Sequence, residues 1–251
     1  MPIDEWKGWV SSGSIEIDGC RLSYSIEGSG PTALVIGSSK YYSKSFSPGL
    51  RKHFRLVFLD WRGFAPDPDP CESEIALDTL LDDIEICRKR LALGSVIVIG
   101  HSAHALMALE YAKKYPEHVS RVVMIGISPN LSSRYAESAD RNWRESVWSE
   151  RKKALDDRIK QLPDSALAEL PPDQRFVKWY IRRAPQAWYD YRFDSSFLWQ
   201  DVTPNMKMFD FLYGVALRDL DISLGLENFH CPVFLALGRY DYIVAPASSW
   251  D

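Results

Sequence analysis

The chain is organised around the stretch Val96-Ile97-Val98-Ile99-Gly100-His101-Ser102-Ala103-His104-Ala105. Its first four residues are apolar and mostly β-branched, which predicts a buried strand. A sharp turn follows with Ser102 at its apex, and residues 106–115 predict a helix that ends before Pro116. Strand, serine turn and helix form the setting of a nucleophile elbow. Such a turn lifts the Ser102 hydroxyl above the carboxyl end of a parallel sheet. It also leaves the Ala103 N–H free to face a developing oxyanion.

The usual elbow pattern is Gly-x-Ser-x-Gly, and this chain keeps only its first glycine, Gly100. His104 occupies the second glycine position, where glycine normally lets strand and helix pack closely. We expect the His104 side chain to point sideways and Ala105 to provide the small contact. The motif alone leaves open a surface serine at an ordinary turn between a strand and a helix.

Length and composition limit the possible folds and partners of the chain. The chain has 251 residues, of which 46% are hydrophobic, so it can hold one large α/β domain with an insertion, or two small domains. Its net charge of −4 shows no basic bias, so we expect no nucleic-acid partner. Trp and Tyr residues are frequent and concentrate after residue 140.

The location predicted from the sequence is the cytoplasm. The start, Met1-Pro2-Ile3-Asp4-Glu5, is acidic and does not predict a signal peptide. No apolar run approaches the roughly 18 residues that span a membrane, so we expect no membrane partner. The cysteines lack Cys-x-x-Cys spacing, which predicts reduced thiols and neither zinc nor disulfides. These cysteines are Cys20, Cys71, Cys87 and Cys231. We expect no metal or other cofactor.

Strand and helix patterns alternate through the first half of the chain. The residues around Asp18-Gly19 predict an edge hairpin. From Ser73 the pattern becomes helical, with Gly94 closing the helix. Short buried strands are predicted at residues 32–36, 55–59 and 121–125. This alternation predicts a parallel sheet covered on both faces, with ligands beyond the carboxyl ends of the strands. Gly37, Gly63, Ser102 and Gly126 fall at such ends.

Ser38 follows the first of these buried strands. Small residues there let backbone N–H groups approach a ligand, so the Ser38 N–H is a candidate for a second oxyanion donor. An ordinary loop between strand and helix is the alternative.

Near residue 130 the pattern changes to helices, and a strand returns only at Pro232-Val233-Phe234-Leu235-Ala236-Leu237. We therefore expect residues 130–229 to form a helical cap inserted into an α/β core of residues 1–129 and 230–251. A separate C-terminal helical domain would not explain the returning strand. The loop after that strand reads Gly238-Arg239-Tyr240-Asp241.

Four segments in order carry a resemblance to a known family. They are Asp60-Trp61-Arg62-Gly63-Phe64, Gly100-His101-Ser102, the run from Tyr111 through Pro116 to Val119, and Gly238-Arg239-Tyr240-Asp241-Tyr242. Together they resemble the α/β-hydrolase superfamily, in particular its proline iminopeptidase-like branch. The resemblance runs from about residue 14 to the end, although the cap matches only in character. It implies an α/β-hydrolase fold, a mostly parallel sheet flanked by helices, with a helical cap insertion.

Site residues follow from this resemblance. It implies Ser102 as nucleophile, Asp241 as the acid of a catalytic triad, and the N–H groups of Ala103 and Ser38 as the oxyanion hole. The branch usually carries His-Gly-Gly-Pro-Gly at the hole, whereas this chain has Ile36-Gly37-Ser38-Ser39-Lys40. The departure weakens the inference of a peptide substrate.

The triad order in this fold is Ser, Asp or Glu, then His, yet no histidine follows Asp241 in the sequence. We expect His53, His118 and His230 at the amino ends of strands and His101 packed beside the turn. His104 is the one histidine near enough to substitute. We therefore expect a truncated form of a longer hydrolase, with an exposed sheet edge that favours a homo-oligomer.

Two main hypotheses follow. The first is a serine hydrolase that cleaves small esters or N-terminal peptide and amide bonds through an acyl-enzyme, with a small molecule or short peptide as substrate. The second is a non-catalytic ligand-binding protein on the same fold, or an inactive truncated form. An epoxide hydrolase or dehalogenase usually needs aspartate at the position of Ser102. Cap carboxylates hold the substrate ammonium in proline iminopeptidases. Asp190, Asp194 and Asp210 are available here but are not assigned.

Overall fold

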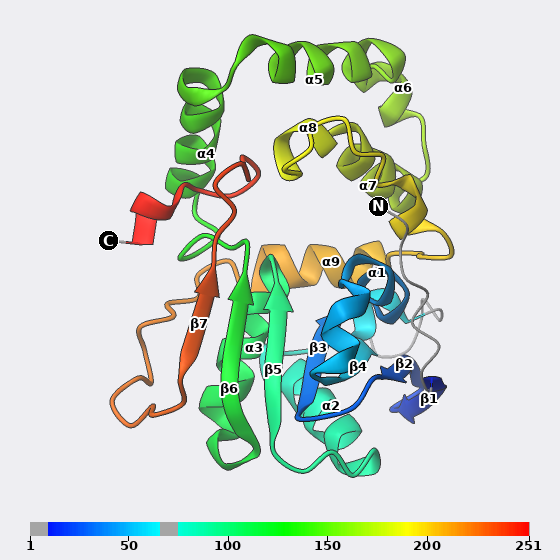
Figure 1. Ribbon diagram of the computed structural model, residues 1–251, viewed down its shortest axis with the longest axis vertical. Coiled ribbons are helices and arrows are strands. Elements are labelled where there is room, and N and C mark those ends of the chain that lie inside the picture. The colour runs from blue at the N-terminus through cyan, green and yellow to red at the C-terminus, as the bar shows by residue number, and fades with distance from the viewer. Residues whose placement is uncertain (1–9, 66–74, 251) are drawn as a thin grey trace.

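The computed structural model describes residues 10–65 and 75–250. In that part of the chain, a seven-stranded sheet has the order β1-β2-β4-β3-β5-β6-β7 (Figure 1). Strands β3 to β7 are parallel to one another, and β1 and β2 form an antiparallel hairpin at one edge. The strands are β1 Val10–Ile17, β2 Cys20–Glu27, β3 Thr32–Gly37, β4 Arg55–Asp60, β5 Val96–His101, β6 Val119–Ile125 and β7 Val233–Ala236.

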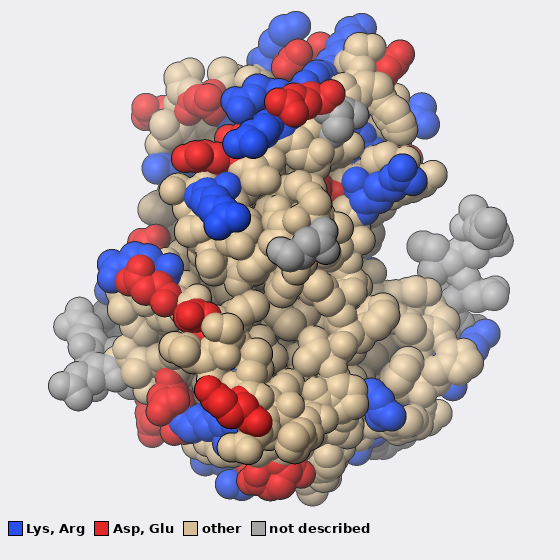
Figure 2. All heavy atoms as spheres, turned by 90° about the vertical axis from the view of Figure 1, so that its left-hand side faces the viewer, with Lys and Arg blue, Asp and Glu red and all other residues tan. Residues whose placement is uncertain are grey.

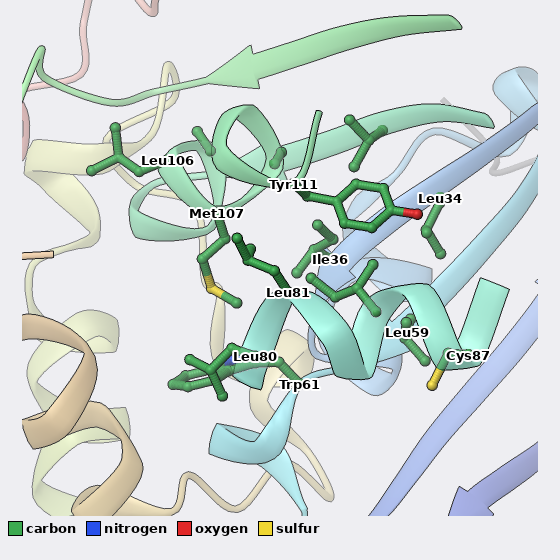
Figure 3. Packing of buried hydrophobic residues seen from close by; sticks show 14 of the residues in the cluster. Leu34, Ile36, Leu59, Trp61, Leu80, Leu81, Cys87, Leu106, Met107 and Tyr111 are labelled. Atoms are coloured by element: carbon green, nitrogen blue, oxygen red, sulfur yellow. The ribbon is translucent and has the colours of Figure 1, made fainter. Parts of the chain in front are cut away.

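The central strands are buried because both faces of the sheet are covered. On one face, Leu34 and Ile36 pack with α2 (Leu77–Arg90) and α3 (Ala103–Lys114) in the larger apolar cluster (Figure 3). On the other face, their neighbour Val35 packs beneath α1 (Ser39–Ser45). Alternate residues of one strand thus enter opposite cores, as expected for a parallel sheet between helices. The predicted α/β fold class is confirmed.

A helical segment joins β6 to β7 and lies beyond the carboxyl ends of the strands (Figure 1). Its helices are α4 Ser133–Ser146, α5 Ser149–Gln161, α6 Asp164–Ala168, α7 Pro172–Arg182, α8 Ala184–Ala187 and α9 Met206–Phe211. Helix α9 crosses the top of the sheet, whereas α4 to α8 arch above it. This is the region that the sequence assigns to a cap, and its position brings it over the ends of β3, β5 and β6.

Buried hydrogen bonds fix the helical segment to the sheet. The Asn205 N–H donates to the Gly63 carbonyl at 2.8 Å, and the Tyr242 N–H donates to the Gln186 carbonyl at 2.7 Å. The Arg151 guanidinium is buried and donates to the carbonyls of Pro185, Trp188 and Tyr189. It also lies over the rings of Tyr240 and Tyr242, beyond β7. Arg151 therefore joins α5, α8 and the loop after β7.

The sequence predicts that Gly94 closes helix α2, and the structure shows an earlier end. The helix ends at Arg90, and the Leu93 N–H donates to the Arg88 carbonyl while the Ala92 N–H donates to the Lys89 carbonyl. This is a Schellman ending whose left-handed residue is Ala92, with φ of 49°. Gly94, with φ of 65°, comes two residues later and turns the chain toward β5.

Some sequence-based expectations lie outside the described residues. They concern the acidic start Met1 to Glu5, Cys71, and the helical pattern beginning at Ser73. Within the described residues, no helix is long and apolar enough to cross a membrane.

Candidate active site

Ser102 stands at a strained turn between β5 and α3. Its backbone has φ of 56° and ψ of −138°, a conformation that residues with a side chain rarely adopt. The Ser102 N–H donates to the Ile125 carbonyl at 2.9 Å, and the Ser102 carbonyl accepts from the Ala105 N–H at 2.8 Å. These bonds to β6 and α3 hold the strained conformation, as is typical of a functional turn.

Close packing of strand against helix occurs at Gly100. A Cβ at this position would lie 2.1 Å from the His104 carbonyl oxygen and 2.6 Å from the Ala105 Cα. Only glycine therefore fits at position 100. The approach involves the backbone of His104 rather than its side chain, which explains how the elbow tolerates a histidine where its usual pattern has glycine.

The His104 side chain lies among aromatic rings. Its ring centroid is 5.7 Å from that of Trp61, 6.2 Å from Phe64 and 6.3 Å from Tyr42. The residue is only 7% exposed, and both of its ring nitrogens are buried. Burial lowers the pKa of His104 to about 3, and the neighbouring His101 adds to this effect. His104 is therefore a neutral imidazole at physiological pH.

A cavity of about 310 Å³ opens above the turn. It brings together three of the four predicted site residues, Ser38, Ser102 and Asp241, and it is also lined by His101 and His104. Aromatic side chains make up much of the rest of its wall. They are Tyr41, Tyr42, Phe46, Phe64, Phe176, Tyr180, Trp188, Trp199, Phe209 and Tyr213.

The two predicted oxyanion donors lie at helix starts beside this cavity. Ala103, the fourth predicted site residue, is the first residue of α3, so its N–H has no acceptor within the helix. Ser38 precedes α1, and its hydroxyl accepts a hydrogen bond from the Tyr41 N–H at 3.2 Å. Gly37 has φ of 151°, and a Cβ there would lie 2.1 Å from the Tyr42 ring. Glycine is thus needed to turn the chain into Ser38.

Asp60 fixes the Ser38 turn, a role that sequence reasoning missed. Its carboxylate accepts a hydrogen bond from the Ser39 N–H at 2.5 Å. Burial raises the pKa of Asp60 to about 6, and the hydrogen bonds from Ser39 oppose this rise. The signal available in the sequence was an aspartate directly after the predicted buried strand 55–59. In the structure this aspartate pairs with Gly37 at the end of β3.

Asp241 lies in the loop that follows β7. Its Oδ1 accepts from the Ile243 N–H at 2.9 Å. Burial raises the pKa of Asp241 to about 6, while backbone hydrogen bonds from Ile243 and Val244 lower it. Its Oδ2 lies on the same side of Gly126 as the His101 ring: a Cβ at Gly126 would be 3.2 Å from Oδ2 and 3.3 Å from His101 Nε2.

Of the five histidines, all within the described residues, only His101 and His104 line the cavity. His101 Nδ1 lies 3.1 Å from the Tyr42 hydroxyl, and burial lowers the pKa of His101 to about 4. His53, His118 and His230 precede β4, β6 and β7, at the amino ends of the strands as predicted. Within the described chain, no hydrogen bond joins a histidine to Asp241.

Tyr213 and Tyr180 are further residues that the sequence did not single out. Burial raises the pKa of Tyr213, whereas side-chain hydrogen bonding with Tyr180 and Ser102 lowers it. The Tyr213 hydroxyl therefore faces Ser102 from the helical segment. The sequence shows that Trp and Tyr residues concentrate after position 140, but not which of their rings meet the serine.

The three cap carboxylates that the sequence offers for holding a substrate ammonium lie outside the cavity. Asp190, Asp194 and Asp210 are exposed. Asp190 accepts from the Arg192 N–H at 3.0 Å, and Asp194 accepts from the Ser196 N–H at 2.9 Å. Among the residues that the structure describes, no group of three or more His, Cys, Asp or Glu side chains could hold a metal ion.

Comparison with known proteins places this geometry in a family. The model of the alpha/beta hydrolase fold family matches residues 34–251. The chain belongs to the α/β-hydrolase family. It is 39% identical over 241 residues to the AB hydrolase superfamily protein YclE of Bacillus subtilis, covering 96% of this chain and 85% of YclE. It is 26% identical to the proline iminopeptidase PfmaB of Pestalotiopsis fici, covering 94% and 84% of the two chains.

Solved structures agree on the fold. An α/β fold family hydrolase from Bacillus anthracis superposes with a TM-score of 0.64 at 17% identity, over 95% of this chain and 85% of that one. This structure confirms the predicted fold. The family model and the relatives confirm the α/β-hydrolase prediction and its resemblance to the proline iminopeptidase-like branch.

Proposed function

We propose that this α/β-hydrolase is a serine hydrolase that cleaves small carboxylic esters or amides at Ser102. The observation that carries the proposal is the strained Ser102 turn at the floor of an aromatic-walled cavity. Strain of this kind persists where the surrounding structure fixes a group for function. The family membership supports the same reaction class.

The reaction has two steps in this proposal. Ser102 Oγ forms a bond to the substrate carbonyl carbon, and the N–H groups of Ala103 and Ser38 stabilise the charge on the carbonyl oxygen. The bond to the leaving alcohol or amine then breaks, the leaving group takes up the proton that the Ser102 hydroxyl gives up, and an acyl-serine remains. Water attacks this ester, Ser102 leaves with a proton, and a carboxylic acid is released.

The five histidines are poorly placed for the proton-transfer step. A triad histidine would stand between Ser102 and Asp241, but His101 bonds to Tyr42 and His104 packs among aromatic rings. Serine without a base is a weak nucleophile. We therefore expect slow turnover from these 251 residues, carried by the oxyanion donors and substrate binding.

The test is hydrolysis of p-nitrophenyl acetate with and without added imidazole, which can supply the missing base. We expect imidazole to raise the rate of the native chain well above that of Ser102→Ala under the same conditions. Ser14→Ala, an exposed serine on β1, is the matched control and should behave like the native chain. Equal rates for the native chain and Ser102→Ala at every imidazole concentration would contradict the proposal.

A ligand-binding protein without turnover is the second candidate. It is favoured by the absence of any hydrogen bond from a histidine to Asp241 within the described residues. This candidate predicts ligand binding in the cavity, with no Ser102-dependent rate even when imidazole is present.

A further inference from the structure

Two tyrosine side chains from the helical segment meet beside Ser102. Tyr213 lies in the π-helical turn Leu212–Ala216, directly after α9, and Tyr180 lies on α7. Both side chains line the cavity together with Ser102. The Tyr213 side chain is hydrogen-bonded with the side chains of Ser102 and Tyr180. The two-step reaction proposed above uses neither tyrosine.

Packing holds the Tyr213 ring in place. The ring stacks on Phe209, with centroids 6.3 Å apart and an angle of 22° between the planes. Phe209 is itself buried and packs 5.3 Å from Phe64. The Leu217 N–H donates to the Leu212 carbonyl at 2.9 Å and closes the turn. Single π-helical turns of this kind are frequent at functional sites, and this one aims a phenol at the serine.

Tyr180 is held by a different part of the helical segment. Its ring stacks on Trp199 with centroids 5.8 Å apart, and it lies 4.9 Å from the Phe176 ring. Helix α7 and the turn after α9 therefore bring two phenol hydroxyls to one place in the cavity.

The hydrogen bonds of Tyr213 have a direction. Burial raises the pKa of Tyr213 above its ordinary value of 10.0, whereas the bonds with Tyr180 and Ser102 lower it. A hydrogen bond lowers the pKa of a phenol when it stabilises the phenolate, which means that the partner donates. The hydroxyls of Ser102 and Tyr180 thus donate to the Tyr213 oxygen. The phenol stays neutral at physiological pH, and its own O–H is left for a further acceptor.

A substrate in the cavity can reach this O–H. Tyr213 is 36% exposed, and Ser102 is partly exposed on the same cavity wall. Among the described residues that line the cavity there is no lysine or arginine. The Tyr213 hydroxyl is therefore a neutral donor that contacts the serine and is open to a bound ester or amide.

We propose that Tyr213 relays the proton of the Ser102 hydroxyl to the leaving group of the substrate. This inference rests on the proposed function, because it supplies the proton path of the same reaction. As Ser102 Oγ bonds to the carbonyl carbon, its proton passes to the Tyr213 oxygen. The Tyr213 proton passes to the leaving oxygen or nitrogen, whose bond to the carbonyl carbon breaks.

The phenol begins and ends this transfer neutral, so no proton is gained or lost in acylation. Deacylation reverses the transfer, with water in the place of the leaving group. Tyr213 gives a proton to Ser102 Oγ as it takes one from the attacking water, and the carboxylic acid is released. A positioned group that moves a proton in this way is a general acid and base in one.

The relay is needed most by a leaving group that departs poorly without a proton. The test therefore compares phenyl acetate with p-nitrophenyl acetate, whose leaving group departs readily as an anion. Tyr213→Phe keeps the ring that stacks on Phe209 and removes only the hydroxyl. After subtraction of the Ser102→Ala rate, we expect this variant to lose about a hundredfold in kcat/KM on phenyl acetate. We expect a loss of only about tenfold on p-nitrophenyl acetate, because its leaving group needs no proton.

Two comparisons separate this role from a structural one. Tyr189→Phe removes a hydroxyl from a tyrosine that is 81% exposed, and it should match the native chain on both esters. Added imidazole should narrow the difference between the native chain and Tyr213→Phe, because imidazole can carry the proton instead. Damage to the shape of the cavity would lower both esters equally and would not respond to imidazole.

Equal losses on the two esters, or no loss on either, would overturn the inference while leaving the proposed function in place. A difference between the native chain and Tyr213→Phe that imidazole does not change would also overturn it. Failure of the proposed function looks different, because the native chain and Ser102→Ala would then hydrolyse both esters at the same rate. In that case the inference falls with the function on which it rests.

Discussion

At the scale of single residues, the elbow depends on a missing side chain at position 100. A Cβ there would collide with the His104 carbonyl oxygen at 2.1 Å, and backbone cannot move aside as a flexible side chain can. We expect Gly100→Ala to lower the free energy of unfolding by about 3 kcal/mol, as strong overpacking does. Gly214→Ala is the matched control, because nothing lies within 4 Å of its added Cβ. Urea denaturation of both variants measures the difference, and equal midpoints would contradict this account of the elbow.

The raised pKa of the Asp241 carboxyl leads to a second prediction at the residue scale. Burial raises its pKa to about 6 from an ordinary value of 3.8, so the folded state holds the proton more tightly than the unfolded chain. Its contribution to stability therefore falls as pH rises from about 4 to about 6. We expect Asp241→Asn to match the native chain near pH 4 and to be more stable by up to about 3 kcal/mol above pH 6.

Unfolding at a series of pH values between 4 and 8 measures this difference. Asp210→Asn removes an exposed carboxylate and is the control that should follow the native curve. An Asp241→Asn variant less stable than the native chain at pH 7 would show that the charged carboxylate stabilises the fold.

At the scale of secondary-structure elements, Arg151 holds the helical segment together. Its guanidinium donates to three carbonyls around α8 and lies over the Tyr240 and Tyr242 rings. Arg151→Ala leaves these carbonyls unpaired, so we expect a loss of about 3 kcal/mol in unfolding free energy. Amide exchange should also become faster in α8. Arg192→Ala, which removes an exposed arginine, should change stability by no more than about 0.5 kcal/mol. Equal exchange rates in both variants would contradict the role of Arg151.

The elements also show what the sequence could predict. Strands β3 to β6 and helix α3 were predictable because local apolar runs and turn residues encode them. The positions of Ser38 and Ser102 beside one cavity followed from the rule that parallel strands end at the same edge, whereas Asp241 was implied by the family resemblance. The aromatic wall was not predictable, because Phe176 and Phe209 meet only through tertiary packing of helices that are distant in sequence. Asp60 was missed because its partner, Ser39, lies on a different strand–helix unit.

At the scale of the whole molecule, strand β7 leaves an open sheet edge. Among residues 10–65 and 75–250 it pairs with β6 alone, and its Val233 and Phe234 are 46% and 65% exposed. Leu224 and Leu226, in the chain leading to β7, are exposed as well. Figure 2, seen from the β7 side, shows uncharged surface across the middle of this face. Such an edge is a template for strand pairing, so we propose that two copies associate through β7.

Sedimentation velocity over a range of concentrations tests this association. We expect dimers at high concentration and monomers for Phe234→Lys. Val215→Lys, which replaces an exposed valine in the helical turn Leu212–Ala216 and not in β7, should remain dimeric like the native chain. A native chain that stays monomeric at every concentration would contradict the proposal.

The central claim is that Ser102 is a nucleophile held beside oxyanion donors. Intact mass and peptide mapping after treatment with a fluorophosphonate, with and without imidazole, test it most directly. The account predicts one added phosphonyl group on the peptide containing Ser102, formed faster as imidazole increases, and absent from Ser102→Ala. A native chain that stays unlabelled at every imidazole concentration, or a Ser102→Ala variant that is labelled equally, would contradict it.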